Sequence, residues 1–177
     1  MLSEDQEIKA EFLMNTCGVS AADRPVVAAA LDKSNATGGE PAMAIQLHDD
    51  RMITGKTSGM LGAAAGALLN ALKAFGGIHQ EIDLISPIVI QPIQDLKVKH
   101  LGNNNPRLHS DEILIALSIC AATNPTAALA LRQLPKLSGC EAHSSVILSR
   151  VDLDVYRRLG INITCEPQYE SNRLYHK

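Results

Sequence analysis

One short run of residues has the composition of an anion-binding turn. Gly55, Lys56, Thr57 and Ser58 follow one another, and they offer backbone N–H, ammonium and hydroxyl groups, which phosphates and carboxylates bind. A phosphate-binding loop of the Walker type needs an earlier glycine five positions before Gly55, where the sequence has Asp50. The sequence therefore predicts a smaller anion site at a strand-to-helix turn. The alternative is that Thr57 or Ser58 caps the helix and that Lys56 is solvated.

A second cluster joins a cation, an imidazole and a carboxylate. Arg107, His109 and Asp111 lie within five residues, next to an Asn-rich run at residues 103–105. An arginine fork beside an imidazole would suit a carboxylate or a phosphate. The structural alternative, which the sequence favours, is that the Asn-rich run forms a tight loop, that Arg107 pairs with Asp111 or a helix end, and that His109 packs before the helix cap.

A third cluster contains Cys140, Glu141 and His143. No second cluster at a fixed spacing accompanies it, so no metal site is expected, and no cofactor is expected either. A strand would point Cys140 and His143 to opposite faces, and we interpret the segment as a β-turn between two strands. The remaining cysteines are interpreted as small core residues: Cys17, Cys120 and Cys165. Catalytic residues stay unassigned, because a serine, histidine and aspartate set depends on folded geometry.

The composition limits the class of protein that can present these residues. The chain has 177 residues, of which 46% are hydrophobic and 20% charged, so it can bury the core of one globular domain. A net charge of −3 and only five aromatic residues argue against a nucleic-acid partner. Unpaired cysteines and an acidic N-terminus predict a cytoplasmic protein. The longest apolar run, residues 59–69, is about half of the roughly 20 residues that a membrane span needs, so no membrane partner is expected.

The spacing of apolar and capping residues predicts the elements. Helices are expected to begin near the following residues: Ser3, Pro25, Thr57, Ser86, Ser110, Asn124 and Ser149. Strands are expected at residues 43–47 and 51–54, as a hairpin, and at 82–85, 137–140, 146–149 and 161–165. The helix over residues 57–75 is apolar almost all round and should be covered on more than one side, with Gly62 and Gly66 allowing close backbone approach. The helix over residues 113–122 is also mostly apolar and is expected to be deeply buried.

Strands that alternate with buried helices predict an α/β fold, namely a three-layer α/β/α sandwich with a mixed sheet. A Gly-containing stretch at residues 35–39 suggests a boundary. We therefore expect an N-terminal helical segment at residues 1–39 and a sandwich domain at residues 40–177.

Four longer runs are distinctive: residues 54–58, 84–87, 105–125 and 133–143. Together they resemble the C-terminal third of the bacterial proteins grouped as domain of unknown function family 1846. The resemblance covers nearly the whole chain and is specific for membership, although it carries no chemistry because the family is uncharacterised. Full-length relatives are much longer, and their earlier part carries a glycine-rich, lysine-containing loop similar to a phosphate-binding loop. The resemblance therefore implies that a missing N-terminal region is a partner of this domain.

The resemblance also implies a topology similar to the cytidine-deaminase-like sandwich. True deaminases place zinc ligands and a proton-shuttling glutamate at the starts of two central helices. In this chain those starts read Lys56, Thr57 and Ser58 at one helix and Ser86 with Pro87 at the other, without a zinc ligand. Hydrolytic deamination is therefore not expected, although the same pocket would suit a small polar ligand.

Two functions are expected from these observations. The first is binding of a small anionic ligand at helix N-termini, in cooperation with the missing phosphate-loop region, through six residues: Lys56, Thr57, Ser58, Ser86, Arg107 and His109. The alternative is a non-catalytic assembly domain that forms a homo-oligomer through the apolar helix at residues 57–75. A peptidase ranks last, because no nucleophile or metal motif supports it.

Overall fold

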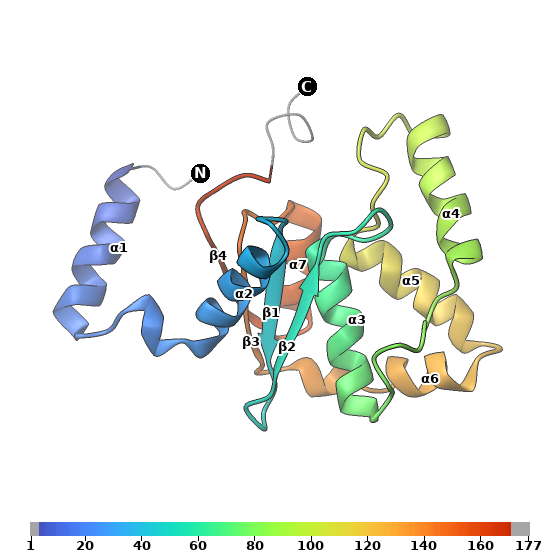
Figure 1. The fold of residues 1–177 in the computed structure, drawn as a ribbon, viewed down its shortest axis with the longest axis horizontal. Coiled ribbons are helices and arrows are strands. Elements are labelled where there is room, and N and C mark those ends of the chain that lie inside the picture. The colour runs from blue at the N-terminus through green and yellow to red at the C-terminus, as the bar shows by residue number, and fades with distance from the viewer. Residues whose placement is uncertain (1–3, 171–177) are drawn as a thin grey trace.

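A four-stranded mixed sheet forms the centre of the chain in the computed structural model, which describes residues 4–170 (Figure 1). The strands are β1 (Ala42–Gln46), β2 (Met52–Lys56), β3 (Glu141–Ser144) and β4 (Asn162–Cys165). Their order is β2-β1-β3-β4, in which β1 runs antiparallel to β2 and to β3 while β3 runs parallel to β4. The predicted hairpin and the mixed sheet are confirmed.

The described part of the chain also contains seven α-helices. They are α1 (Glu4–Cys17), α2 (Pro25–Ala36), α3 (Ala63–Gly76), α4 (Pro87–Asp95), α5 (Ser110–Ala121), α6 (Pro125–Leu131) and α7 (Arg150–Arg158). Short 3-10 turns lie at Ala21–Asp23 (η1) and Leu134–Leu137 (η3), and α4 continues into a π-helical turn at Leu96–His100 (η2). Within residues 4–170 no helix combines the length and the apolar character that crossing a membrane requires.

Two of the predicted helix starts carry side-chain caps. The Asn124 side chain accepts hydrogen bonds from the first turn of α6, and the Ser149 side chain accepts one from the Asp152 N–H in α7. Pro25 and Pro87 begin α2 and α4, as expected for proline in the first turn. The predicted cap residue Ser3 lies outside the described residues.

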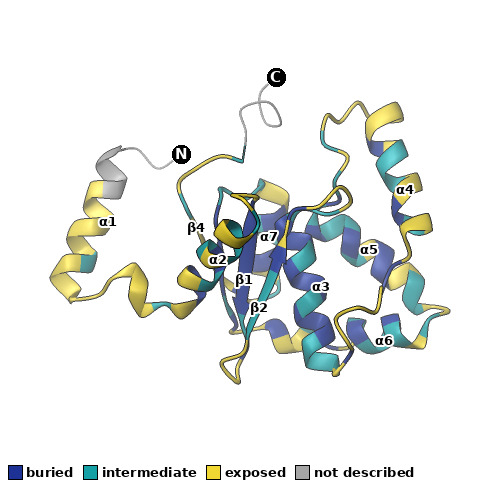
Figure 2. Cartoon of the chain, in the orientation of Figure 1, coloured by how far each residue is buried: buried dark blue, intermediate teal, exposed yellow. Residues whose placement is uncertain are grey.

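Helices pack on both faces of the sheet. On β1, Ala44 joins Val26 and Ala30 of α2 in one apolar cluster, whereas Met43 and Ile45 belong to the larger core that contains α3. Because successive side chains of a strand point to opposite faces, α2 and α3 lie on opposite sides of the sheet. The chain is therefore an α/β protein, and its cytidine-deaminase-like topology stays a prediction. The helix α1 lies apart from the sheet, exposed along most of its length (Figure 2).

Helix α3 lies between the sheet and the pair α5 and α6, which explains why it is apolar almost all round. Its backbone approaches β2 so closely that a Cβ atom on Gly55 would lie 2.2 Å from the Ala67 backbone nitrogen. A Cβ atom on Gly66 would likewise lie 3.4 Å from the Lys56 carbonyl oxygen. The close approach predicted for Gly66 is therefore a contact with the strand that forms the edge of the sheet.

The start of α3 was predicted wrongly. The helix begins at Ala63, with Gly62 as its N-cap, and not at Thr57. Lys56 ends β2, and residues 57–62 form a loop in which the Ser58 hydroxyl accepts hydrogen bonds from the N–H groups of Met60 and Leu61. The Ser58 hydroxyl therefore shapes the loop, and neither Thr57 nor Ser58 caps the helix.

Three predicted strands are wrong as well. Residues 82–85 form a loop with Leu84 and Ile85 buried, residues 137–140 end η3 and turn, and residues 146–149 are irregular. The true third strand, β3, was interpreted as a turn, because Glu-Ala-His-Ser has none of the β-branched or aromatic residues typical of strands. In α5 only one face is buried, since Ile115 and Ile119 are 60% and 64% exposed.

Candidate functional site

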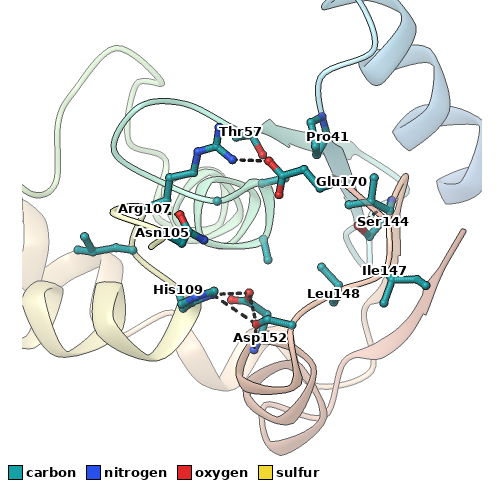
Figure 3. A pocket seen from close by; sticks show the side chains of 16 residues that line it. Pro41, Thr57, Asn105, Arg107, His109, Ser144, Ile147, Leu148, Asp152 and Glu170 are labelled. Atoms are coloured by element: carbon teal, nitrogen blue, oxygen red, sulfur yellow. Dashed lines mark hydrogen bonds and ion pairs between the residues drawn. The ribbon is translucent and has the colours of Figure 1, made fainter. Parts of the chain in front are cut away.

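A pocket lies where three helices begin. The starts of α3, α5 and α7 line it together with the end of β3 and the loops before α3 and α5 (Figure 3). The first N–H groups of a helix have no partner inside the helix, and they carry the positive end of its dipole. The cavity that remains between the lining residues has a volume of about 30 Å³, room for a group the size of one or two water molecules.

Two loops that carry pocket residues are joined to each other. Leu61 and Leu108 form an isolated parallel bridge, in which the Leu108 N–H donates to the Met60 carbonyl (2.9 Å) and the Gly62 N–H donates to the Leu108 carbonyl (3.2 Å). This bridge places residues 57–62, which lead into α3, beside residues 103–108, which lead into α5.

Arg107 supplies a cation to one wall of the pocket. Its guanidinium forms an ion pair with the Glu170 carboxylate, and both side chains are largely buried, at 26% and 14% exposure. The Arg107 N–H donates to the Asn105 side chain (3.1 Å), and the Lys97 ammonium donates to the Arg107 carbonyl (2.6 Å) and to Glu112 (2.7 Å). Arg107 is therefore fixed from its backbone, and it pairs with Glu170 and not with Asp111.

The opposite wall holds a histidine and an aspartate (Figure 3). His109 Nδ1 lies 2.9 Å from one oxygen of Asp152, and the other oxygen accepts hydrogen bonds from the Ser110 N–H (2.8 Å) and hydroxyl (2.6 Å). The Ser149 hydroxyl also donates to Asp152, at 2.7 Å. Asp152 therefore joins the first turn of α7 to the first turn of α5.

The electrostatics of this pair favour an ionised aspartate beside a basic histidine. The hydrogen bond to Asp152 raises the pKa of His109 above its ordinary value, against the opposing effect of burial. Burial by itself would raise the pKa of Asp152, but the hydrogen bonds from His109, Ser110 and Ser149 outweigh it and lower that pKa. Because a carboxylate oxygen only accepts, Nδ1 of His109 carries a proton. No other residue between 4 and 170 forms a hydrogen bond with Nε2 of His109.

Thr57 is the third predicted residue that lines this pocket. It is only 6% exposed, and its N–H donates to the Pro41 carbonyl at 2.9 Å. Its hydroxyl forms no hydrogen bond with any residue in the described part of the chain. A hydroxyl that is accessible from a cavity and has no protein partner is a ready donor or acceptor for a ligand.

The other three predicted residues lie elsewhere. Lys56 is exposed and lines a second cavity of about 260 Å³ between α3 and α4, together with Asn70 and Lys73. Ser58 is exposed in the loop, and Ser86 is exposed at the start of α4. The structure therefore brings Thr57, Arg107 and His109 together and leaves Lys56, Ser58 and Ser86 outside the pocket.

The cluster predicted around Cys140 is dispersed by the sheet. Cys140 Sγ lies 3.8 Å from His48 Nε2, but that nitrogen donates to the Lys136 carbonyl at 3.0 Å and cannot accept the thiol proton. Burial also raises the pKa of Cys140, so the thiol stays protonated. Glu141 pairs with Arg24.

His143 lies on β3 and not in a turn. Its two ring nitrogens contact the Thr164 hydroxyl (2.8 Å) and the Glu166 carboxylate (3.0 Å). Burial lowers its pKa, against the hydrogen bond to Glu166. Among residues 4–170, no group of three or more His, Cys, Asp and Glu side chains is arranged to hold a metal ion.

The two acids that pair with Arg107 and His109 in the pocket, Glu170 and Asp152, are not among the predicted site residues. Asp152 was interpreted only as part of the helix cap with Ser149, and Glu170 belonged to a segment without a distinctive pattern. Each meets its partner across a long stretch of sequence, 43 residues for His109 with Asp152 and 63 residues for Arg107 with Glu170. The cap motif at residues 149–152 was the one local signal that pointed to Asp152.

Comparisons with known proteins place this chain among longer ones. Residues 22–175 match the family model described as "Domain of unknown function DUF1846, C-terminal". A "UPF0371 protein" of Streptococcus pneumoniae (strain CGSP14) is 50% identical over 176 residues, which cover 99% of this chain and 35% of that protein. The "UPF0371 protein stu1377" of Streptococcus thermophilus is 51% identical over 169 residues, covering 96% of this chain and 34% of that protein. The chain thus spans about a third of the length of the curated relatives that it matches.

Proposed function

We propose that this chain, which belongs to the DUF1846 family and matches its C-terminal domain, binds a small oxyanion in the pocket where α3, α5 and α7 begin. The ligand would carry a carboxylate or a phosphate group. The curated relatives are about three times as long as this chain. The proposed partner is the remainder of a full-length protein of that size, and the proposed location is the cytoplasm.

The observation that carries this proposal is the ion pair of Arg107 and Glu170 inside the pocket. The pocket already holds a carboxylate against a guanidinium, next to the first turn of a 14-residue helix. Arginine forms two parallel hydrogen bonds with carboxylates and phosphates, which makes it a specific group for such ligands. The site therefore has the chemistry that an oxyanion needs.

Three further kinds of hydrogen-bond donor belong to residues that line the pocket beside Arg107. The Thr57 hydroxyl lines the pocket without a partner among residues 4–170. The N–H groups at the start of α3 have no partner inside their helix. His109 offers Nε2, which donates when the imidazole is protonated. An anion that contacts Arg107 would thus have neutral and charged donors on several sides, as a buried anion requires.

Arg107→Gln tests the proposal. The unfolding of the protein would be followed by thermal shift and binding by calorimetry, with millimolar nucleotides, sugar phosphates and di- and tricarboxylates. A ligand at 100 times its Kd stabilises the folded state by about 2.7 kcal/mol, which is readily measured. We expect at least one class to stabilise the native chain, and Arg107→Gln to abolish the effect.

Lys56→Ala is the matched control, because it also removes one positive charge, from an exposed residue outside this pocket. It should bind the same ligand with unchanged affinity. The proposal is contradicted when no compound stabilises either the native chain or the variant Glu170→Gln, in which a neutral amide replaces the internal carboxylate. Loss of binding in Lys56→Ala alone would contradict it too, since the ligand would then occupy the cavity between α3 and α4.

Assembly is the second candidate function, favoured by helix α1. The helix expected to mediate assembly, now α3, is covered by the sheet and by α5 and α6 and offers no free apolar face. Instead α1 lies apart from the body with its large apolar residues exposed: Ile8 60%, Phe12 67% and Leu13 61%. A helix of 14 residues is only marginally stable without packing, so α1 needs a surface to cover this side.

A further inference from the structure

We propose that Glu170 is an internal ligand of the oxyanion pocket, so that the C-terminal segment competes with any external anion for Arg107. This inference rests on the proposed function and adds its regulation. It also names the ligand class: an oxyanion with at least two terminal oxygens on one atom, as in carboxylates and phosphates.

The first argument is the position of the carboxylate. Glu170 lines the pocket from the side opposite the Asn105 loop, and it meets the Arg107 guanidinium inside the cavity (Figure 3). The volume left free is only about 30 Å³, so a ligand and the Glu170 side chain do not fit beside each other on Arg107. An external carboxylate would have to take the place of this one.

The second argument is that residues 166–170, which carry Glu170, are attached outside the apolar core. Residues 166–170 run past the end of β3, where the Glu166 N–H donates to the Ser144 carbonyl (2.9 Å) and the Ile147 N–H donates to the Gln168 carbonyl (2.7 Å). The Gln168 side chain donates to the Ser145 carbonyl at 2.8 Å, and the Glu166 carboxylate lies 3.0 Å from His143 Nε2. Residues 167–169 are exposed, and none of residues 166–170 belongs to the apolar core. Moving Glu170 out of the pocket therefore leaves the core intact.

The third argument is the strength of competition from a tethered group. A group held by a short segment has an effective concentration in the millimolar range. An external anion must exceed this competition before it occupies Arg107. The native chain should therefore bind simple anions weakly, and a chain without the Glu170 charge should bind them more tightly.

The test measures Kd by calorimetry for two probes, inorganic phosphate and succinate. Glu170→Gln keeps the shape of the side chain and removes its charge, and we expect about tenfold tighter binding of at least one probe. Which probe gains more affinity distinguishes phosphate from carboxylate ligands. Glu81→Gln is the matched control, because it removes the same charge from a side chain that is 90% exposed and remote from the pocket lining. It should leave both Kd values unchanged.

Two further variants complete the design. Gln168→Ala loosens the segment without changing a charge, and we expect a smaller gain of affinity in the same direction. The double variant Arg107→Gln with Glu170→Gln should bind neither probe. Thermal melting of each variant checks that it is folded.

The possible failures are separable. When Glu170→Gln binds with the native affinity and Arg107→Gln still abolishes binding, the pocket binds anions but Glu170 does not compete, and this inference is overturned. When Glu170→Gln binds neither probe although a compound of the first screen stabilises the native chain, this inference is overturned as well. When no compound stabilises either chain and neither probe binds, the proposed function itself fails.

Discussion

Asp152 is a buried acid that accepts hydrogen bonds from two helix starts and from one histidine. Removing one member of such a pair leaves the other without its partner in a poorly solvated place. The pair also fixes the proton of His109 on Nδ1, the arrangement by which a carboxylate orients an imidazole in sites of many folds. At the scale of residues, the pocket is thus an ordered polar cluster in which Arg107 pairs with Glu170 and His109 pairs with Asp152.

The His109 pair makes stability depend on pH in a defined direction. A raised pKa in the folded state means that the stabilisation is complete below the ordinary histidine pKa of about 6.5 and is lost as the pH rises through the higher, folded-state pKa. His109→Asn keeps a neutral N–H group and loses the charge. We expect it to cost about 1.5 kcal/mol of unfolding free energy at pH 5.5 and less above pH 8.

Urea unfolding between pH 5.5 and pH 8.5 measures this difference. His79→Asn serves as the control, since the His79 side chain is 72% exposed, and its cost should be small at every pH. A cost of His109→Asn that stays constant, or that grows with pH, would mean that the imidazolium does not stabilise the fold. The pKa of Asp152 is lowered in the folded state, so its ionised form also stabilises the fold. This stabilisation is lost as the pH falls from the ordinary aspartate pKa through the lower, folded-state pKa.

At the scale of elements, the position of the pocket depends on how closely α3 packs against β2. Gly55 has no side chain where the Ala67 backbone lies, and this allows the helix to approach the strand. Tyr156 of α7, which is completely buried, donates its hydroxyl to the Ala64 carbonyl at 2.8 Å and so joins α7 to the first turn of α3. The three helix starts are therefore held together by core contacts.

Gly55→Ala should be strongly destabilising. The new Cβ would lie 2.2 Å from a backbone atom, which cannot rotate away, so strand and helix must separate. Overpacking of this kind costs about 2 to 4 kcal/mol of unfolding free energy. Gly59→Ala, at a loop position where nothing lies within 4 Å of the added Cβ, should change stability by less than about 0.5 kcal/mol. Equal stability of the two variants in denaturant unfolding would contradict the packing argument.

The elements show what local patterns can and cannot predict. The hairpin, α2, α6 and α7 follow from turn residues, caps and prolines, which act over a few positions. The start of α3 was misplaced by six residues, because Thr57 and Ser58 look like capping residues while the actual cap is Gly62, which provides no side-chain signal. The strand β3 is stabilised by β1 and β4 on its two sides, a long-range effect that its own residues do not indicate.

At the scale of the whole molecule, the lining of the candidate pocket could be predicted only in part, for the same reason. Arg107 and His109 were found because they are close in sequence, and Thr57 because it resembles a phosphate-loop residue. Asp152 and Glu170 come from the far end of the chain and needed the folded topology. Lys56 and Ser86 were predicted because the two helix starts that carry them were expected to converge. The helix starts that line the pocket are instead those of α3, α5 and α7.

The exposed helix α1 predicts association in solution. At micromolar concentration, light scattering should give a mass above the 19.0 kDa of one chain, because Phe12 and Leu13 would be covered by a second copy. Phe12→Ser with Leu13→Ser should return the mass to that of one chain. Ile119→Ser, which alters a similarly exposed residue on α5, should not. A native chain that is monomeric at all concentrations would remove the support for the assembly function.

The bridge between Leu61 and Leu108 has a mechanical consequence. It fastens the loop that leads into α3 to the loop that leads into α5, so Thr57 and Arg107 sit on a single stiff rim. A ligand that displaces either residue would therefore shift the starts of both helices together. Glu170 belongs to a different segment, the one that follows β4. If the pocket opens, we therefore expect this rim to keep its shape and the C-terminal segment that carries Glu170 to move.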